Sequence, residues 1–296
     1  MGENKIGDLR VRYPHGTELV EDIYPYPRET VKYREVCDNL NLLYNRFSFW
    51  SKDKNGKPDT GYKALEKGAE RFAERIRSCD CPNLWNMLNT NMEKIAEIFD
   101  TKIRIIYQPL HRLLIGIGPE SPYSSTSLMT LHHVYGIPYI PGSAIKGVLR
   151  NCWIQENFEG KEEDALKCDV FRALFGGSED VEAGTQAQAG ALTFFDSFPV
   201  DGFQLEFDVQ TPHYPDYYQS QKAPTDDQKP IPISIPAIVE SKFLVMIAVN
   251  NDKWPRKYYN DVEEMLGRAL TEYGLGAKTA LGYGLGEVYK LSETSK

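Results

Sequence analysis

Residues 274–286, GLGAKTALGYGLG, place five glycines around one lysine near the end of this 296-residue chain. Glycine accepts positive φ and lets another backbone come close, so a loop this rich in glycine usually contacts something. Apolar residues recur at helical spacing over 261–273, and 283–289 has the pattern of a strand. We therefore expect helix, glycine loop and strand, with a helix C-cap and tight turn as the plainer alternative for the loop.

The loop matches neither of the common nucleotide-binding patterns. A Walker A loop ending at Lys278 needs glycine at 272 and 277, where the chain has Glu272 and Ala277. A dinucleotide-binding loop starting at Gly274 needs glycine at 279, where Thr279 stands, and a strand before it. Backbone amides and Lys278 still suit a phosphate that is not held by either motif.

The net charge of −8 by itself disfavours a nucleic-acid binder, because phosphate contacts need lysine and arginine. The charge is unevenly distributed, however. Residues 101–154 carry five basic and one acidic side chain, and residues 155–240 carry five basic and 17 acidic ones. The first segment leaves room for a basic groove, whereas the acidic segment is expected to face away from nucleic acid and suits a basic partner.

The composition is that of an ordinary globular protein. Its longest apolar run, 243–249, is far too short to span a bilayer, and the polar start MGENK lacks the apolar core of a signal peptide. We therefore expect a cytoplasmic protein. Five cysteines form an odd set without a CxxC pair, which supports neither a disulfide framework nor a zinc site. We expect no cofactor and no metal.

A helical N-terminal extension is predicted for residues 1–100. Between 61 and 78, basic residues and glutamates recur at spacings of three and four, which describes a solvated helix face. A proline-rich segment at 24–27 cannot lie inside a helix. The extension is interpreted as structural.

A second domain is predicted for residues 101–296, where the pattern changes to strand at alternating Ile103, Ile105 and Tyr107. The order that follows is strand, helix, strand, insertion, strand, helix, strand, with the insertion at about 200–240 between the second and third core strands. This β-α-β-β-α-β order is that of the ferredoxin-like fold, an α+β fold shared with RNA-recognition domains. Further elements are expected at 113–117, 190–195, 203–209, 231–239 and 242–250 as strands and at 162–175 as a helix.

The first core helix is expected to follow the segment GIPYIPGS at 136–143. Ser143 is a suitable N-cap, and an apolar face follows at helical spacing: Ile145, Val148, Leu149, Cys152 and Trp153. Lys146 and Arg150 lie one turn apart on the other flank, beside a helix N-terminus whose amides attract anions. A phosphate-binding pair and an ordinary solvated pair both remain open here.

An aromatic segment, QTPHYPDYY at 210–218, follows the predicted strand at 203–209. Its prolines exclude regular ladder pairing. A histidine among tyrosines is typical of a loop that stacks on bases or grips a peptide, and equally of an aromatic connection anchored over a core.

The motifs together resemble a known family. GIPYIPGSAIKGVLR at 136–150 resembles the first-helix signature of the RAMP superfamily of CRISPR-associated proteins, and 274–286 resembles the C-terminal glycine-rich loop of that superfamily. With the segment at 208–218 and the N-terminal extension, the chain is similar to one branch in particular, subunit six of the type III-B Cmr effector complex. The resemblance covers roughly residues 100–290.

The resemblance implies a modified RNA-recognition fold that binds CRISPR guide RNA near its 3′ side, at the end of a filament of like-folded backbone subunits. Other Cmr subunits, including the small helical subunit, and target RNA would be its partners. In such complexes base pairing reads the sequence while the protein holds the guide backbone. The implied RNA-binding residues are Arg112, Ser143, Lys146, Arg150, His213, Tyr214, Gly274, Gly276, Lys278, Thr279 and Gly282.

A subunit without catalytic activity is the first hypothesis, and an endoribonuclease is its alternative. A metal-independent ribonuclease would use a histidine as general acid or base, with His111, His132, His133 and His213 as candidates. The adjacent His132 and His133 are expected to point in different directions. A two-metal nuclease would need clustered carboxylates, for which Asp208 and Asp216 are a thin basis.

Overall fold

The computed structural model describes residues 3–6, 9–12, 41, 48–50, 82–99, 101–118, 129–178, 186–211, 223, 233–250 and 259–291. The chain divides into two compact units. The hairpin unit contains Met1–Ser78, Gly116–Pro138 and Leu205–Ala237, and the sheet unit contains Cys79–Ile115, Tyr139–Gln204 and Ile238–Lys296. The expected domain boundary near residue 100 stays a prediction.

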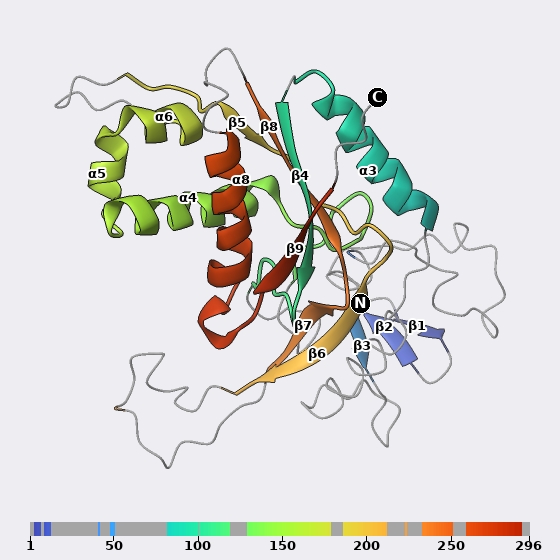
Figure 1. Cartoon of the computed structure of the whole chain (residues 1–296). Coiled ribbons are helices and arrows are strands. Elements are labelled where there is room, and N and C mark those ends of the chain that lie inside the picture. Colours follow the sequence, from blue (N-terminus) through green and yellow to red (C-terminus); the bar gives the residue numbers. More distant parts are fainter. Residues whose placement is uncertain are drawn as a thin grey trace. The chain divides into compact units, whose positions relative to one another are not determined.

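The sheet unit is built on four antiparallel strands that lie side by side in the order β5-β8-β4-β9 (Figure 1). Their bounds are Thr101–Pro109 for β4, Leu192–Phe194 for β5, Phe243–Val249 for β8 and Gly286–Lys290 for β9. On β4 the buried positions include Ile103, Ile105 and Tyr107, which confirms the predicted alternation. Every residue of β8 is buried, because both faces of this central strand are covered.

Helices lie over both faces of the sheet. Lys290 of β9 forms an ion pair with Glu263 of α8 (Tyr259–Arg268) at 3.2 Å. Lys290 is the strand partner of Ile105 on β4, and Ile105 is in turn the partner of Val245 on β8, so the three side chains lie on the same face of the sheet. α8 therefore covers the Val245 face, together with α4 (Gly142–Phe158). The next residue, Met246, points to the opposite face, where it packs with Ala96 of α3 (Pro82–Ala96).

Between β5 and β8 the chain forms a two-stranded sheet of β6 (Gln204–Gln210) and β7 (Ile233–Val239), inside the predicted insertion. The expected helix at 162–175 is two short helices, α5 (Glu162–Lys167) and α6 (Asp169–Phe175). Cys168 breaks the helix because its backbone is extended, with φ −81° and ψ 120°.

The described part of the N-terminal segment includes a three-stranded antiparallel sheet of β1 (Glu3–Ile6), β2 (Leu9–Arg12) and β3 (Ser48–Trp50). The helical interpretation of the remainder of residues 1–81 stays a prediction. Among the described helices, none combines the length and the apolar character that crossing a membrane requires.

Two predictions about local structure are wrong. α4 begins at Gly142 with Pro141 as its N-cap, so Ser143 lies in the first turn. The carboxylate of Asp196 accepts a hydrogen bond from the Gly142 amide at 2.8 Å, so this helix N-terminus already holds an anion from its own chain. Residues 113–117 are not a strand: Leu113 forms an isolated bridge to Ile238, and a positive φ of 60° at Gly116 ends the extended run.

Candidate RNA interface

The glycine loop, residues 274–286, follows a π-helical turn, η4 (Ala269–Tyr273), at the end of α8 and includes a short 3-10 turn, η5 (Thr279–Leu281). Four of its glycines have φ between 67° and 89°: Gly274, Gly276, Gly282 and Gly284. This left-handed region is open to glycine and unfavourable for other residues, so the glycines are required by the backbone path.

The base of the loop is fixed against residues 110–114, the segment that continues β4. Hydrogen bonds run from the Ala277 amide to the Leu114 carbonyl at 2.9 Å and from the Gly284 amide to the Arg112 carbonyl at 2.8 Å. The two sides of the loop are joined by a third, from the Leu275 amide to the Gly284 carbonyl at 2.9 Å. The loop is therefore a structured element anchored to the sheet.

Glycine is also required at the base because the backbones approach so closely. A Cβ on Gly276 would lie 2.2 Å from the Leu114 carbonyl oxygen, and one on Gly284 would lie 1.8 Å from the Leu275 carbonyl oxygen. At Gly282 no heavy atom of the described residues lies within 4 Å of an added Cβ. The close approach of another backbone that these glycines predicted is made, at the base, by the chain itself.

The tip of the loop, residues 278–282, is more open than its base: Ala280 and Leu281 are exposed, whereas Lys278 and Thr279 are half-buried. The backbone of Lys278 has the left-handed conformation, with φ 60°, although the other left-handed residues of this loop are glycines. Leu281 is 74% exposed, and Gly282 borders open space. The structure thus brings Arg112 and the five predicted loop residues into one region: Gly274, Gly276, Lys278, Thr279 and Gly282.

Lys146 and Arg150 are engaged on a different flank of α4. Lys146 Nζ donates to the carbonyl of Phe175, the last residue of α6, at 2.8 Å. Arg150 pairs with Glu162 of α5 at 2.6 Å, and its guanidinium lies 5.1 Å from the centre of the Phe171 ring. These contacts dock α5 and α6 on α4.

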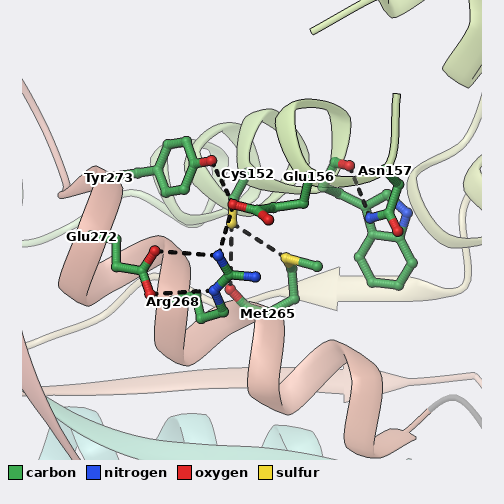
Figure 2. Close-up of polar contacts among 8 residues, drawn as sticks. Cys152, Glu156, Asn157, Met265, Arg268, Glu272 and Tyr273 are labelled. Atoms are coloured by element: carbon green, nitrogen blue, oxygen red, sulfur yellow. Dashed lines mark hydrogen bonds and ion pairs between the residues drawn. The ribbon is translucent and has the colours of Figure 1, made fainter. Parts of the chain in front are cut away.

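A third group joins α4 to the start of the loop (Figure 2). Glu156 Oε1 accepts hydrogen bonds from Arg268 at 2.8 Å and from the Tyr273 hydroxyl at 2.9 Å, and Arg268 also pairs with Glu272. One turn before Glu156, the thiol of Cys152 contacts Met265. Helical geometry puts this flank about 120° around α4 from Lys146 and Arg150. We call Glu156, Arg268 and Tyr273 the clamp.

The clamp shifts the pKa of each of its members. Hydrogen bonds from Tyr273 and Arg268 hold the pKa of Glu156 below its usual value, and those to Glu272 and Glu156 raise the pKa of Arg268. Burial and the hydrogen bond to Glu156 raise the pKa of Tyr273 to about 12. Burial raises the pKa of the neighbouring Cys152 thiol to about 11, so this cysteine stays protonated at neutral pH.

The model of the RAMP superfamily matches residues 107–287, from within β4 to within β9. The chain belongs to the RAMP superfamily. The match includes both sequence motifs, the α4 signature and the glycine loop.

Two relatives of this RAMP chain carry the same subunit name. It is 33% identical to the CRISPR system Cmr subunit Cmr6 of Pyrococcus furiosus over 223 residues, which are 58% of this chain and 64% of that protein. The chain thus spans a little under two thirds of the Pyrococcus relative. It is 29% identical to Cmr6 of Saccharolobus solfataricus over 303 residues, 89% of this chain and 93% of that protein.

A solved structure supports the RAMP fold. A chain of the type III-B Cmr-beta complex bound to cognate target RNA superposes with a TM-score of 0.56, covering 78% of this chain and 76% of that one. The identity of 22% makes this a likeness of fold.

Among the histidines of this RAMP chain, His132 and His133 differ from their prediction. Their rings are stacked, with centroids 5.1 Å apart and planes 11° apart, and Tyr135 stacks on His132 at 4.6 Å. A tight turn closed by the hydrogen bond from the Gly136 amide to the His132 carbonyl brings the rings together. The expectation that adjacent histidines point apart is therefore wrong.

The other candidates do not stack with this pair, or lie outside the described residues. His111 is exposed. Asp208 lies on β6 and accepts a hydrogen bond from the Val209 amide. His213, Tyr214 and Asp216 lie outside the part of the chain that the structure describes.

Proposed function

We propose that this chain is an RNA-binding subunit, equivalent to Cmr6, of a type III-B CRISPR RNA-guided complex. Membership of the RAMP superfamily and the two Cmr6 relatives support this assignment. Its partners would be guide RNA, target RNA and the other Cmr subunits. We place the chain at the end of the backbone filament, near the guide 3′ side, in antiviral defence.

The sheet favours the RNA-recognition type of fold. The elements run β4, α4, β5, β8, α8, β9, and the sheet order β5-β8-β4-β9 puts the first and third core strands side by side in the centre. We infer a ferredoxin-like core with β6 and β7 inserted between its second and third strands.

The observation that carries the proposal is the glycine loop, fixed at its base and open at its tip. A rigid base would hold the Lys278 ammonium and the backbone around Gly282 in place, and Gly282 itself has no side chain to block an approaching phosphodiester. Such contacts hold phosphates and carry no sequence information, which leaves sequence reading to the guide. A subunit that acts in this way needs no catalytic group.

Crosslinking of the complex purified from its host tests this function. We expect a short CRISPR-derived RNA to crosslink at Lys278–Gly282 and other RAMP subunits to co-purify. A chain that purifies with neither RNA nor RAMP subunits would contradict the proposal. A crosslink confined to α4 would still support RNA binding by this chain but would show that RNA contacts α4 and not the glycine loop.

The stacked His132 and His133 support a second candidate, a metal-independent endoribonuclease. Parallel rings 5.1 Å apart can present two imidazoles to one phosphate, one as base toward the 2′-hydroxyl and one as acid toward the leaving oxygen. RNA cleavage in the presence of a metal chelator that disappears in His132→Ala, with His111→Ala as the matched control, would establish this activity. Absence of cleavage in the unaltered chain would exclude it.

A further inference from the structure

The clamp joins the helix that contains the first superfamily motif to the turn directly before the second. Glu156 belongs to the last turn and a half of α4, whereas Tyr273 is the residue directly before the glycine loop. The carboxylate oxygen Oε1 of Glu156 receives both Arg268 and Tyr273, 2.8 and 2.9 Å away. One atom of the signature helix therefore fixes both the last residue of α8 and the last residue before the loop.

This convergence depends on the π turn. Residues five apart in an α-helix lie about 140° apart around the axis, so side chains at 268 and 273 of a regular helix would not meet one oxygen. In η4 the Gly274 amide bonds to the Ala269 carbonyl at 2.9 Å, five residues back, and this wider turn brings Tyr273 to the side of Arg268. π turns are rare and often occur at functional sites, where the changed direction of the chain is used.

The direction of the chain at Tyr273 determines where the loop starts. Gly274 follows with φ 79°, and Leu275 and Ala277 are then bonded to Gly284 and Leu114. The loop thus has two independent anchors, residues 110–114 at its base and the clamp at its start. The first is made of backbone bonds, whereas the second depends on three side chains.

We propose that Glu156 and Tyr273 are positioning residues for RNA binding, holding the start of the glycine loop so that its tip meets the phosphate backbone. The inference rests on the proposed function. It assigns to α4 a role carried by its Glu156 flank, separate from the Lys146 and Arg150 flank that docks α5 and α6. Neither residue needs to touch RNA.

The test is the affinity of the 296-residue chain for a fluorescein-labelled single-stranded RNA, measured by anisotropy over a series of salt concentrations. Tyr273→Phe removes one hydroxyl and with it one hydrogen bond that orients the loop. We expect roughly three- to tenfold weaker binding. We also expect a smaller salt slope, which is the change in the logarithm of the association constant with the logarithm of the salt concentration. Glu156→Gln keeps an acceptor oxygen for Tyr273 and should retain most of the affinity, whereas Glu156→Ala should behave like Tyr273→Phe.

Tyr289→Phe is the matched control, because the hydroxyl of Tyr289 also bonds a glutamate, Glu287, but on β9, where the tyrosine is exposed. It should leave both affinity and salt slope unchanged. If Tyr273→Phe lowers the melting temperature but leaves the affinity for RNA and its salt slope unchanged, the clamp only stabilises the fold, and the inference is overturned. An unaltered chain that binds no RNA would overturn the proposed function and, with it, the inference.

Discussion

The glycine loop and the basic flank of α4 both present cations, yet the structure treats them differently. The loop is held by backbone hydrogen bonds at its base, and at its tip Leu281 is exposed and Lys278 is half-buried. On α4, Lys146 and Arg150 direct their charged groups to a helix C-terminus and to a carboxylate of the same unit. A positive charge in a sequence motif is thus not by itself a phosphate site, because its donors can serve the fold. Substitutions in the two regions should separate fold from binding.

The largest expected effect is that of Gly284→Ala at the base of the loop. An added Cβ would lie 1.8 Å from the Leu275 carbonyl oxygen in a backbone with φ 67°, so the loop must shift. Overpacking and left-handed strain together should lower the free energy of unfolding by about 3 kcal/mol or more. Urea unfolding of the full chain measures this loss.

Gly282→Ala is the control for that substitution. It has a similar φ of 89° but open space around the added Cβ, so its cost should be only the conformational strain, about 1–2 kcal/mol. Equal losses for the two variants would show that backbone strain alone, and not close approach, decides the use of glycine in this loop.

The next effect is that of removing both α4 cations, Lys146→Ala with Arg150→Ala. The double variant loses a charged hydrogen bond to Phe175 and a half-exposed ion pair with Glu162, and should be destabilised by about 2 kcal/mol. Because these contacts lie within the fold, we expect the salt slope of RNA binding to stay unchanged. Lys278→Ala should show the reverse, a slope smaller by about one and little change in stability.

The double variant therefore decides a prediction that is still open. The resemblance to RAMP proteins implies that Lys146 and Arg150 contact guide phosphates. A salt slope smaller by about two in the double variant would show that Lys146 and Arg150 both contact RNA phosphates.

The sequence predicted the elements that depend on periodicity. Alternation at Ile103, Ile105 and Tyr107 gave β4, and the apolar stripe of α8 gave a helix ending at Tyr273. It also grouped the glycines of the loop with Lys278. Local patterns carry this information because they arise from burial on one face.

The sequence failed where the partner is distant along the chain. Ser143 has the chemistry of an N-cap, but Asp196, 54 residues away, takes that role for Gly142. For Lys146 and Arg150 the sequence leaves a solvated pair and a phosphate-binding pair open, because their partners Phe175 and Glu162 lie 29 and 12 residues away along the chain. Glu156, Arg268 and Tyr273 gave no signal, since a π turn has no sequence pattern of its own and their convergence depends on tertiary packing.

The smallest expected effect is a pH dependence of the clamp. The pKa of Tyr273 is raised from about 10 to about 12, so the folded chain holds this proton more tightly than the unfolded chain. Its contribution to stability is fully present below pH 10 and is lost as the pH rises through 12. The difference in unfolding free energy between the unaltered chain and Tyr273→Phe should therefore narrow steadily above pH 10. Glu156, Cys152 and Arg268 act on the pKa of this hydroxyl, and Cys152, with a pKa of about 11, titrates in the same window. Cys152→Ala in both backgrounds removes that overlap.

The contradicting outcome is a difference in unfolding free energy between the unaltered chain and Tyr273→Phe that stays constant from pH 8 to pH 11. The Tyr273 hydroxyl would then not be bonded to Glu156 in solution, and the start of the glycine loop would be held by its base alone.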